Sequence, residues 1–318
     1  KAISPVRTLH LLIARAAGTD PDQGTNRYSE RLGYWPAAFG LLAFVWLELV
    51  SPSSTELGPV RLWFAVYVGA MVVGGALFGS GFFARADPFE VYSTLVGKAS
   101  IWAVREGRLL VRSPLSNLSS IEPRPGLIGV VGVLFGSTGF DSFGDSPAYV
   151  SFVQGTDING NLINNATLVA FCLAATGIIA VGSALTGVGS EQRRRDLPNA
   201  FAHSIMPIVI GYVVAHYLNY LLEVGSRTLQ QASDPFSNGS DVLGTGDWGD
   251  ITYLAYHPTL LASTKVGAVV VGHVIAAILA HERALRLLPA RHQLTGQLPL
   301  LLAMVGFTSA GLYLLFSS

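Results

Sequence analysis

The chain has 318 residues, of which 50% are hydrophobic and only 13% are charged, and its mean hydropathy is +0.47. Soluble domains carry about 25% charged residues, so this composition is that of an integral membrane protein. The formal net charge of zero excludes the basic footprint of a nucleic-acid-binding protein, and the single cysteine, Cys172, excludes a disulfide within the chain and a cysteine-based metal cage.

Residues 1–32 form a basic lead-in before the first apolar stretch. Within it, residues 4–18 have the pattern of a short interfacial helix, with leucines on one side and arginines at its flanks. We expect His10 in this helix to lie at the surface. Because the chain begins with Lys1 rather than Met, we also expect further segments upstream.

Seven apolar stretches follow, each near the roughly 20 residues that a membrane-spanning helix needs. They cover residues 33–50, 61–83, 126–143, 166–189, 199–223, 264–285 and 296–316. The sequence therefore predicts an all-α fold, a polytopic transmembrane helix bundle of about seven spans. Its parts are the lead-in, spans one and two (33–83), a segment at 84–125, spans three and four (126–189), and spans five to seven (190–318).

The charges sort to one side of this arrangement. Of the 20 Lys and Arg residues, 17 fall in the lead-in, in the 84–125 segment, or in the connections before spans five and seven. Only Arg61, Arg227 and Lys265 fall on the other side. By the positive-inside rule the basic side is cytoplasmic, which predicts a multi-pass plasma-membrane protein whose C-terminus lies outside.

The connecting segments carry further signals. Residues 86–103 have the pattern of an interfacial or re-entrant helix, and residues 104–115 that of a small hairpin, so the 84–125 segment would cap the cytoplasmic face or dock a partner. The outer loops, 140–165 and 223–263, are long and acidic. Three aromatic residues predict that the second of these loops packs down as a lid: Trp248, Tyr253 and Tyr256.

Two of the spans carry two histidines each, and ionisable side chains in such segments are costly and usually mark a site. They are His203 and His216 in span five, and His273 and His281 in span six. Because the two spans are antiparallel and a helix rises 1.5 Å per residue, His216 and His273 fall at similar depth in the outer half. His203 and His281 both fall near the cytoplasmic end. If the spans touch, the histidines form two pairs across the helices.

We interpret the outer pair, His216 and His273, as ligands of a divalent transition metal (zinc, copper or iron) with an open position for water. Asp234 or Asp241 in the outer loop would assist from above as ligand or base, and the metal-bound water would attack an ester. Hydrogen bonding of each imidazole to a neighbouring helix is the alternative interpretation.

The inner pair, His203 and His281, is interpreted mainly as structural, because His281 is followed by Glu282 and Arg283 at the membrane edge. The alternative role of this pair is to bind a cofactor, haem b, between the two helices.

Several separate stretches resemble, in the same order, one known family. They are residues 30–50, 87–100, 105–118, 136–147, 215–222, 232–247 and 272–285. The family comprises bacterial, largely actinobacterial, polytopic membrane proteins labelled fenitrothion hydrolase-like. The resemblance implies a membrane-bound enzyme of the bacterial plasma membrane that hydrolyses an organophosphate triester, with further spans upstream.

The motif positions that the resemblance carries over are those already singled out: His203, His216, Asp234, Asp241, His273 and His281. Glu282 stands where the family has an aspartate, which keeps the charge. The chain has no nucleophile elbow, no HExxH and no phosphate-binding glycine loop, so no standard hydrolase motif supports the implied activity.

Two alternatives to an enzyme stay open. One is a non-catalytic membrane subunit of a larger complex, in which the 84–125 segment and the outer loops dock a membrane or periplasmic protein. The other is a redox subunit that binds haem. In every case the lipid bilayer surrounds the spans. An ion-coupled transporter is disfavoured, because histidines are the only ionisable residues expected in mid-span.

Overall fold

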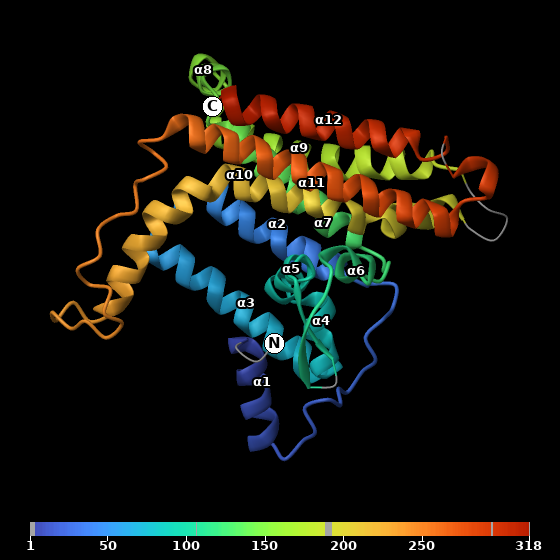
Figure 1. Ribbon diagram of the computed structural model, residues 1–318. Coiled ribbons are helices and arrows are strands. Elements are labelled where there is room, and N and C mark those ends of the chain that lie inside the picture. The colour runs from blue at the N-terminus through green and yellow to red at the C-terminus, as the bar shows by residue number, and fades with distance from the viewer. Residues whose placement is uncertain (1–3, 106, 188–192, 294, 318) are drawn as a thin grey trace.

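A computed structural model of the protein describes residues 4–105, 107–187, 193–293 and 295–317 (Figure 1). Among these residues, six helices are long and apolar enough to cross a membrane. They are α3 (Leu57–Phe78), α7 (Leu127–Gly144), α9 (Gly160–Ala184), α10 (Leu197–Ser233), α11 (Pro258–Leu287) and α12 (Leu298–Ser317). Figure 1 shows α9 to α12 side by side with similar axes. The predicted all-α membrane bundle is therefore confirmed.

The first predicted span forms α2 (Trp35–Leu49), which has 15 residues and is shorter than the six long helices. At 1.5 Å per residue it covers roughly 22 Å, less than the roughly 30 Å of a bilayer core. Nevertheless α2 runs in the same direction as α7. The Trp35 ring lies against Gly129 near the start of α7, and Val50 packs in one cluster with Phe140 near its end. The helix is thus part of the bundle, although its length alone does not make it a span.

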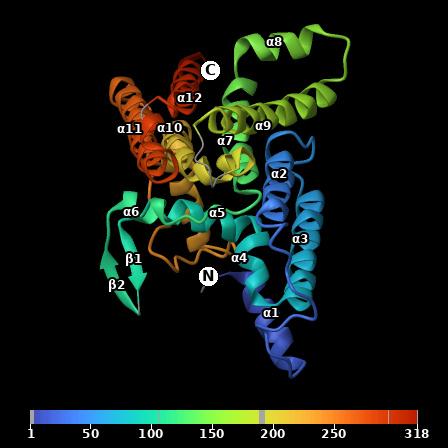
Figure 2. The ribbon, with the colours of Figure 1, turned by 90° about the vertical axis from the view of Figure 1, so that its right-hand side faces the viewer.

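The helix ends differ from the predicted spans on the side of the acidic loops. Helix α7 runs to Gly144 and is followed by α8 (Pro147–Gly155), so most of the predicted loop 140–165 is helical. Local capping explains this, because Ser146 Oγ accepts a hydrogen bond from the amide of Tyr149 and so begins α8. Figures 1 and 2 together show that α8 lies crosswise to the long helices. Helix α10 continues to Ser233, which leaves a shorter loop at 234–257.

On the other side, α9 ends at Ala184, whereas the predicted end at 189 lies outside the described residues. Short 3₁₀ turns precede α4, α10 and α12: η1 (Ser80–Phe82), η2 (Arg194–Asp196) and η3 (Ala290–His292).

The lead-in contains the expected helix, α1 (Pro5–Ala16), but the surface position predicted for His10 is wrong. His10 is only 6% exposed, its Nε2 donates to the carbonyl oxygen of Pro21 over 3.0 Å, and its ring packs on Phe83. The reason is tertiary, because α1 packs against α3 and buries the side of α1 that carries His10. Residues 1–3 of the predicted lead-in lie outside the described residues.

The 84–125 segment contains helices and a β-hairpin, the kinds of secondary structure predicted for it. The short α4 (Phe83–Ala86) and α5 (Pro88–Gly97) are followed by an antiparallel hairpin of β1 (Trp102–Arg105) and β2 (Arg108–Val111), and then by α6 (Pro114–Ser119). Gly107 in the turn has a φ of +76°, a conformation that glycine adopts without strain. A helix and a hairpin, as expected from the sequence, are therefore both present, and the position of the helix at the membrane interface stays a prediction.

Helices α10 and α11 approach each other backbone to backbone. A Cβ atom at Gly211 would lie 2.5 Å from the carbonyl oxygen of Ala268, and one at Gly272 would lie at least as close to the carbonyl oxygen of Pro207. The two backbones therefore meet directly, which only residues without a side chain permit. This contact fixes the rotation of both helices about their axes, and so decides where their histidines point.

Candidate functional site

His216 lies at the centre of a hydrogen-bonded group on α7 and α10, which we call the His216 cluster: Asp141, Ser142, Tyr212, His216 and Tyr217. Its Nε2 lies 3.0 Å from Asp141 Oδ2, and its Nδ1 lies 3.0 Å from Ser142 Oγ. The Tyr212 hydroxyl donates to Ser142 Oγ over 2.7 Å, and the Tyr217 hydroxyl donates to Asp141 Oδ2. Five polar side chains thus form one continuous chain of hydrogen bonds.

The chemistry of the donors and acceptors gives this chain a direction. An ionised Asp141 only accepts hydrogen bonds, so Nε2 of His216 carries the proton that it shares with Oδ2. Nδ1 is then the unprotonated nitrogen, and it accepts the hydroxyl hydrogen of Ser142. The Ser142 oxygen in turn receives the hydrogen of Tyr212. Hydroxyl, imidazole and carboxylate therefore stand in the order found in nucleophile–base–carboxylate triads.

The sequence explains how these groups meet. Tyr212 and His216 are four residues apart on α10, which places both on one face, and their rings are nearly parallel with centroids 6.3 Å apart. Asp141 and Ser142 are neighbours near the end of α7, which packs against that face. The cluster therefore lies where the two most buried helices of the bundle cross.

One end of the cluster is buried and the other is open. Ser142 is fully buried and Tyr212 is 2% exposed, whereas the side chains of His216 and Asp141 are 17% and 20% exposed. Glu48, at the end of α2, lies near enough for its charge to act on Asp141. A small molecule that approaches the cluster would therefore meet the carboxylate and the imidazole before the serine.

His273, the predicted partner of His216, points elsewhere. Its Nδ1 lies 2.9 Å from Oγ1 of Thr308 on α12, whereas His216 faces α7. The glycine contact gives the reason. At about 100° per residue, His216 is rotated by about 140° from Gly211, and His273 by about 100° from Gly272, so both point away from the shared interface. The structure does not bring the two imidazoles of the predicted metal pair together.

In the part of the chain that the structure describes, no group of three or more His, Cys, Asp or Glu side chains is arranged so that it could hold a metal ion. Metal binding by His216 and His273 accordingly stays a prediction from the sequence.

The two aspartates predicted to assist the histidines lie far from them. Helix α10 continues to Ser233, so Asp234 follows His216 by about 27 Å along the helix axis. Asp234 accepts hydrogen bonds from the amides of Asn238 and Gly239. Its carboxylate therefore folds its own loop, and the structure does not bring it to the histidines, because the helix is longer than the predicted span.

Asp241 has the same kind of role. It accepts hydrogen bonds from the hydroxyl of Ser233 and from the amides of Thr245 and Gly246. These donors favour the ionised form and hold the pKa of Asp241 below its ordinary value of 3.8, with the Ser233 hydroxyl as the largest cause. The amides of Asn238 and Gly239 lower the pKa of Asp234 in the same way.

The 234–257 loop should therefore loosen in acid. A lowered carboxyl pKa contributes stability that is present above the ordinary value of 3.8 and is lost as the pH falls through the lower folded value. We expect the amides of Asn238 and Gly239 to lose protection from hydrogen exchange below pH 3.8, after correction for the intrinsic rate.

Two matched variants test whether the Asp234 carboxylate in particular orders the loop. Asp234→Asn should raise exchange at Asn238 and Gly239 at neutral pH, whereas Asp247→Asn, an exposed aspartate of the same loop, should not. Equal exchange in both variants and in the native chain would show that Asp234 does not order the loop.

The expectation that this loop forms a lid is wrong. Trp248, Tyr253 and Tyr256 are 51%, 60% and 80% exposed, so their rings do not pack down on the bundle. Figure 1 shows the loop, in orange, extending away from the long helices at the far end of α10. The length of α10 carries the loop beyond the place where these rings would cover the histidines.

The inner histidines make separate local hydrogen bonds. His203 is 2% exposed and its Nδ1 donates to the carbonyl oxygen of Ala200 over 3.0 Å. Gln297 Nε2, at the start of α12, donates to His281 Nδ1 over 2.8 Å. These contacts agree with a structural role at the end of the bundle, and haem binding by this pair stays a prediction.

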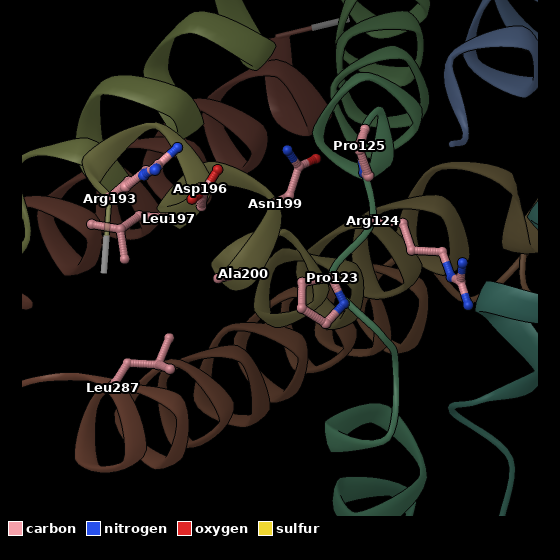
Figure 3. A pocket seen from close by; sticks show the side chains of 9 residues that line it. All are labelled: Pro123, Arg124, Pro125, Arg193, Asp196, Leu197, Asn199, Ala200 and Leu287. Atoms are coloured by element: carbon pink, nitrogen blue, oxygen red, sulfur yellow. The ribbon is translucent and has the colours of Figure 1, made fainter. Parts of the chain in front are cut away.

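Two pockets, of about 360 and 420 Å³, lie at the other end of the bundle from the His216 cluster. Figure 3 shows the first, where Arg193 and Asp196 lie on one side and the Arg124 side chain points away. Arg124 pairs instead with Glu122 and Glu30. Neither pocket is lined by a member of the His216 cluster, so neither serves that cluster as a substrate cavity.

Asp141 and Ser142 are absent from the predicted site. They lie where the predicted third span (126–143) and the predicted outer loop (140–165) overlap, and the prediction named only histidines of spans five and six and aspartates of the second outer loop. The signal that marks them is the 136–147 stretch, one of the segments that carry the family resemblance. Comparisons of the chain with protein-family models, with curated proteins and with solved structures found no match.

Proposed function

We propose that the protein is an integral membrane hydrolase in which Asp141 and His216 activate the hydroxyl of Ser142. The observation that carries this proposal is the directed chain of hydrogen bonds from Ser142 through His216 to Asp141. The resemblance to fenitrothion hydrolase-like proteins supports an organophosphate triester as the class of substrate. Such apolar molecules partition into the bilayer, from which the chain's helices are accessible.

Each member of the cluster has a part in this reaction. His216 Nδ1 takes the proton of Ser142 as Oγ attacks the phosphorus atom and the aryloxide departs. Asp141 holds the Nε2 proton and stabilises the imidazolium that forms, while Tyr217 helps to hold the carboxylate in place. The imidazolium gives the proton of Ser142 to the departing aryloxide, and the neutral imidazole then takes a proton from water as the water oxygen attacks the phosphorus atom. The bond to Ser142 Oγ breaks, the imidazolium returns the proton to Oγ, and the phosphodiester leaves.

The burial of Ser142 sets a condition on this mechanism. Because its side chain is fully buried, a substrate reaches Oγ only when the end of α7 or the Tyr212 side chain moves. The partly exposed side chains of Asp141 and His216 mark the side from which the opening would occur. Binding of the substrate would therefore be coupled to a small displacement at this helix crossing.

The test is hydrolysis of diethyl 4-nitrophenyl phosphate by the purified chain in lipid nanodiscs. We expect a burst of nitrophenolate stoichiometric with the protein, a diethylphosphoryl mass shift on the peptide that contains Ser142, and loss of both in Ser142→Ala. The steady rate in that variant should fall by about 10³-fold or more.

Other outcomes identify what is wrong. If Ser142→Ala remains active while His216→Gln does not, the imidazole activates water and Ser142 only positions it. If the purified protein carries a stoichiometric transition metal that His216→Gln removes, His216 is a ligand rather than a base. If neither native nor variant protein hydrolyses the ester, the proposed hydrolase is contradicted.

A further inference from the structure

The β1–β2 hairpin sorts its side chains by face. In the antiparallel register Trp102 is opposite Val111, and Val104 is opposite Leu109, and residues directly opposite each other project from the same face. One face of the hairpin is therefore formed by four large apolar side chains. Trp102 is 54% exposed, Val111 72%, Val104 74% and Leu109 66%.

The opposite face is mixed: it carries Arg108 and Arg112 together with the apolar side chains of Ile101, Ala103 and Leu110. Side chains alternate along a strand, so Arg108, next to Leu109, projects from the other face. The amide of Arg112 donates to the carbonyl oxygen of Ile101, which extends the pairing and places Arg112 on that same face. Both arginines are exposed. The hairpin is thus amphipathic: Trp102, Val104, Leu109 and Val111 form an apolar face, and the other face carries two arginines among smaller apolar patches.

Nothing else in the described chain covers the apolar face, as its exposure shows, and Figure 2 shows the hairpin projecting away from the long helices. An isolated two-stranded hairpin is marginally stable at best in water, so this face needs an apolar environment. The root of the hairpin is held in place, because α5 packs against α2, and α6 packs against α10 and α11. The hairpin therefore stands beside the helices at a fixed position.

We propose that the hairpin is a lipid anchor whose apolar face enters the interface of the bilayer that the long helices cross, while Arg108 and Arg112 bind anionic lipid phosphates. The helix at the root of the hairpin, α6, packs against α10 and α11, so the hairpin lies next to two of the helices that are long and apolar enough to cross a bilayer. A tryptophan and arginines flanking an apolar face are the side chains that settle at the lipid–water boundary. Arginines that face away from the hydrocarbon complement the negative charge of phosphate headgroups. This inference is independent of the proposed hydrolase.

The test places a fluorescent bimane on each face in turn. Val104→Cys and Leu110→Cys are made in a chain whose single cysteine, Cys172, is replaced by alanine, and each is placed in phosphatidylcholine–phosphatidylglycerol nanodiscs. An interfacial face lies about 5–10 Å below the surface, at the depth of shallow doxyl-labelled lipids. We expect those lipids to quench the label at 104 more strongly than the label at 110, and aqueous iodide to show the reverse order.

Two further outcomes would overturn the anchor. A label at 104 that iodide quenches and doxyl lipid does not would place the apolar face in water. A label at 104 that is protected from both quenchers would mean that protein, such as a second copy of the chain, covers it. The role of the arginines is tested by the double variant Arg108→Glu with Arg112→Glu. It should reduce doxyl quenching of the label at 104 more in nanodiscs that contain phosphatidylglycerol than in nanodiscs of pure phosphatidylcholine. An equal reduction in both lipids would contradict the binding of headgroups by these arginines.

Discussion

Replacing His216 by glutamine is expected to lower the rate of triester hydrolysis by about 10²- to 10⁴-fold, the usual contribution of a general base. Glutamine is similar in size and can still bond with Asp141, so the variant should fold, but it cannot take the proton of Ser142. The measurement compares the initial rates of nitrophenolate release by native and variant protein in nanodiscs. Each rate is divided by the amount of folded protein, which is determined by gel filtration.

Asp141→Asn should give a loss of similar size for a different reason. The asparagine amide can donate to Nε2 of His216, which favours the tautomer in which Nδ1 carries the proton. That nitrogen then cannot accept the Ser142 hydrogen. Because the two residues act as one unit, the double variant should be little worse than either single variant. If the fold-loss in rate of the double variant equals the product of the two single fold-losses, Asp141 and His216 act independently.

His273→Gln is the matched control. This histidine lies on the neighbouring helix and bonds to Thr308, outside the His216 cluster. If the cluster alone performs the chemistry, His273→Gln should hydrolyse the ester at close to the native rate. If His216 and His273 share a metal, as the sequence predicts, both variants should lose activity together and both should lose the metal. Comparing His216→Gln with His273→Gln therefore decides whether the His216 cluster acts alone or the two histidines share a metal.

The fold was largely predictable because the signal that produces it is strong. Long apolar stretches have few alternatives to helices in a membrane, since each buried backbone group must find a partner. The ends of the helices were not predictable in the same way. Polar residues such as those at 224–233 continue α10 although they lack the hydropathy of a span, and the cap at Ser146 begins a helix inside a stretch that hydropathy predicts to be a loop.

The site was only half predictable. The apolar context singled out His216, and the cluster does form around it. Its partners could not be deduced from depth alone, because depth places His273 beside His216 but rotation about the helix axis directs them to different neighbours. That rotation depends on which glycines meet across α10 and α11. A single sequence shows many glycines in these spans and does not show which of them face each other.

Alanine in place of a glycine at the contact between α10 and α11 is expected to destabilise the protein. Gly272→Ala would place a Cβ against the carbonyl oxygen of Pro207, in a position where neither backbone can yield without moving a helix. Overpacking of this kind costs about 1–3 kcal/mol, and occasionally more. We expect a lower midpoint of unfolding for the purified protein in mild detergent titrated with sodium dodecyl sulfate. Gly211→Ala, which would meet the carbonyl oxygen of Ala268, should act in the same direction.

Gly267→Ala is the control, because it makes the same chemical change on the same helix where a Cβ would meet nothing within 4 Å. There the better helix propensity of alanine should leave stability unchanged or raise it by up to about 1 kcal/mol. Gly272→Ala should therefore be less stable than Gly267→Ala. If Gly272→Ala is as stable as Gly267→Ala, α10 and α11 do not meet backbone to backbone. The rotation that separates His216 from His273 would then lose its physical basis, and a metal shared between them would again be the stronger interpretation.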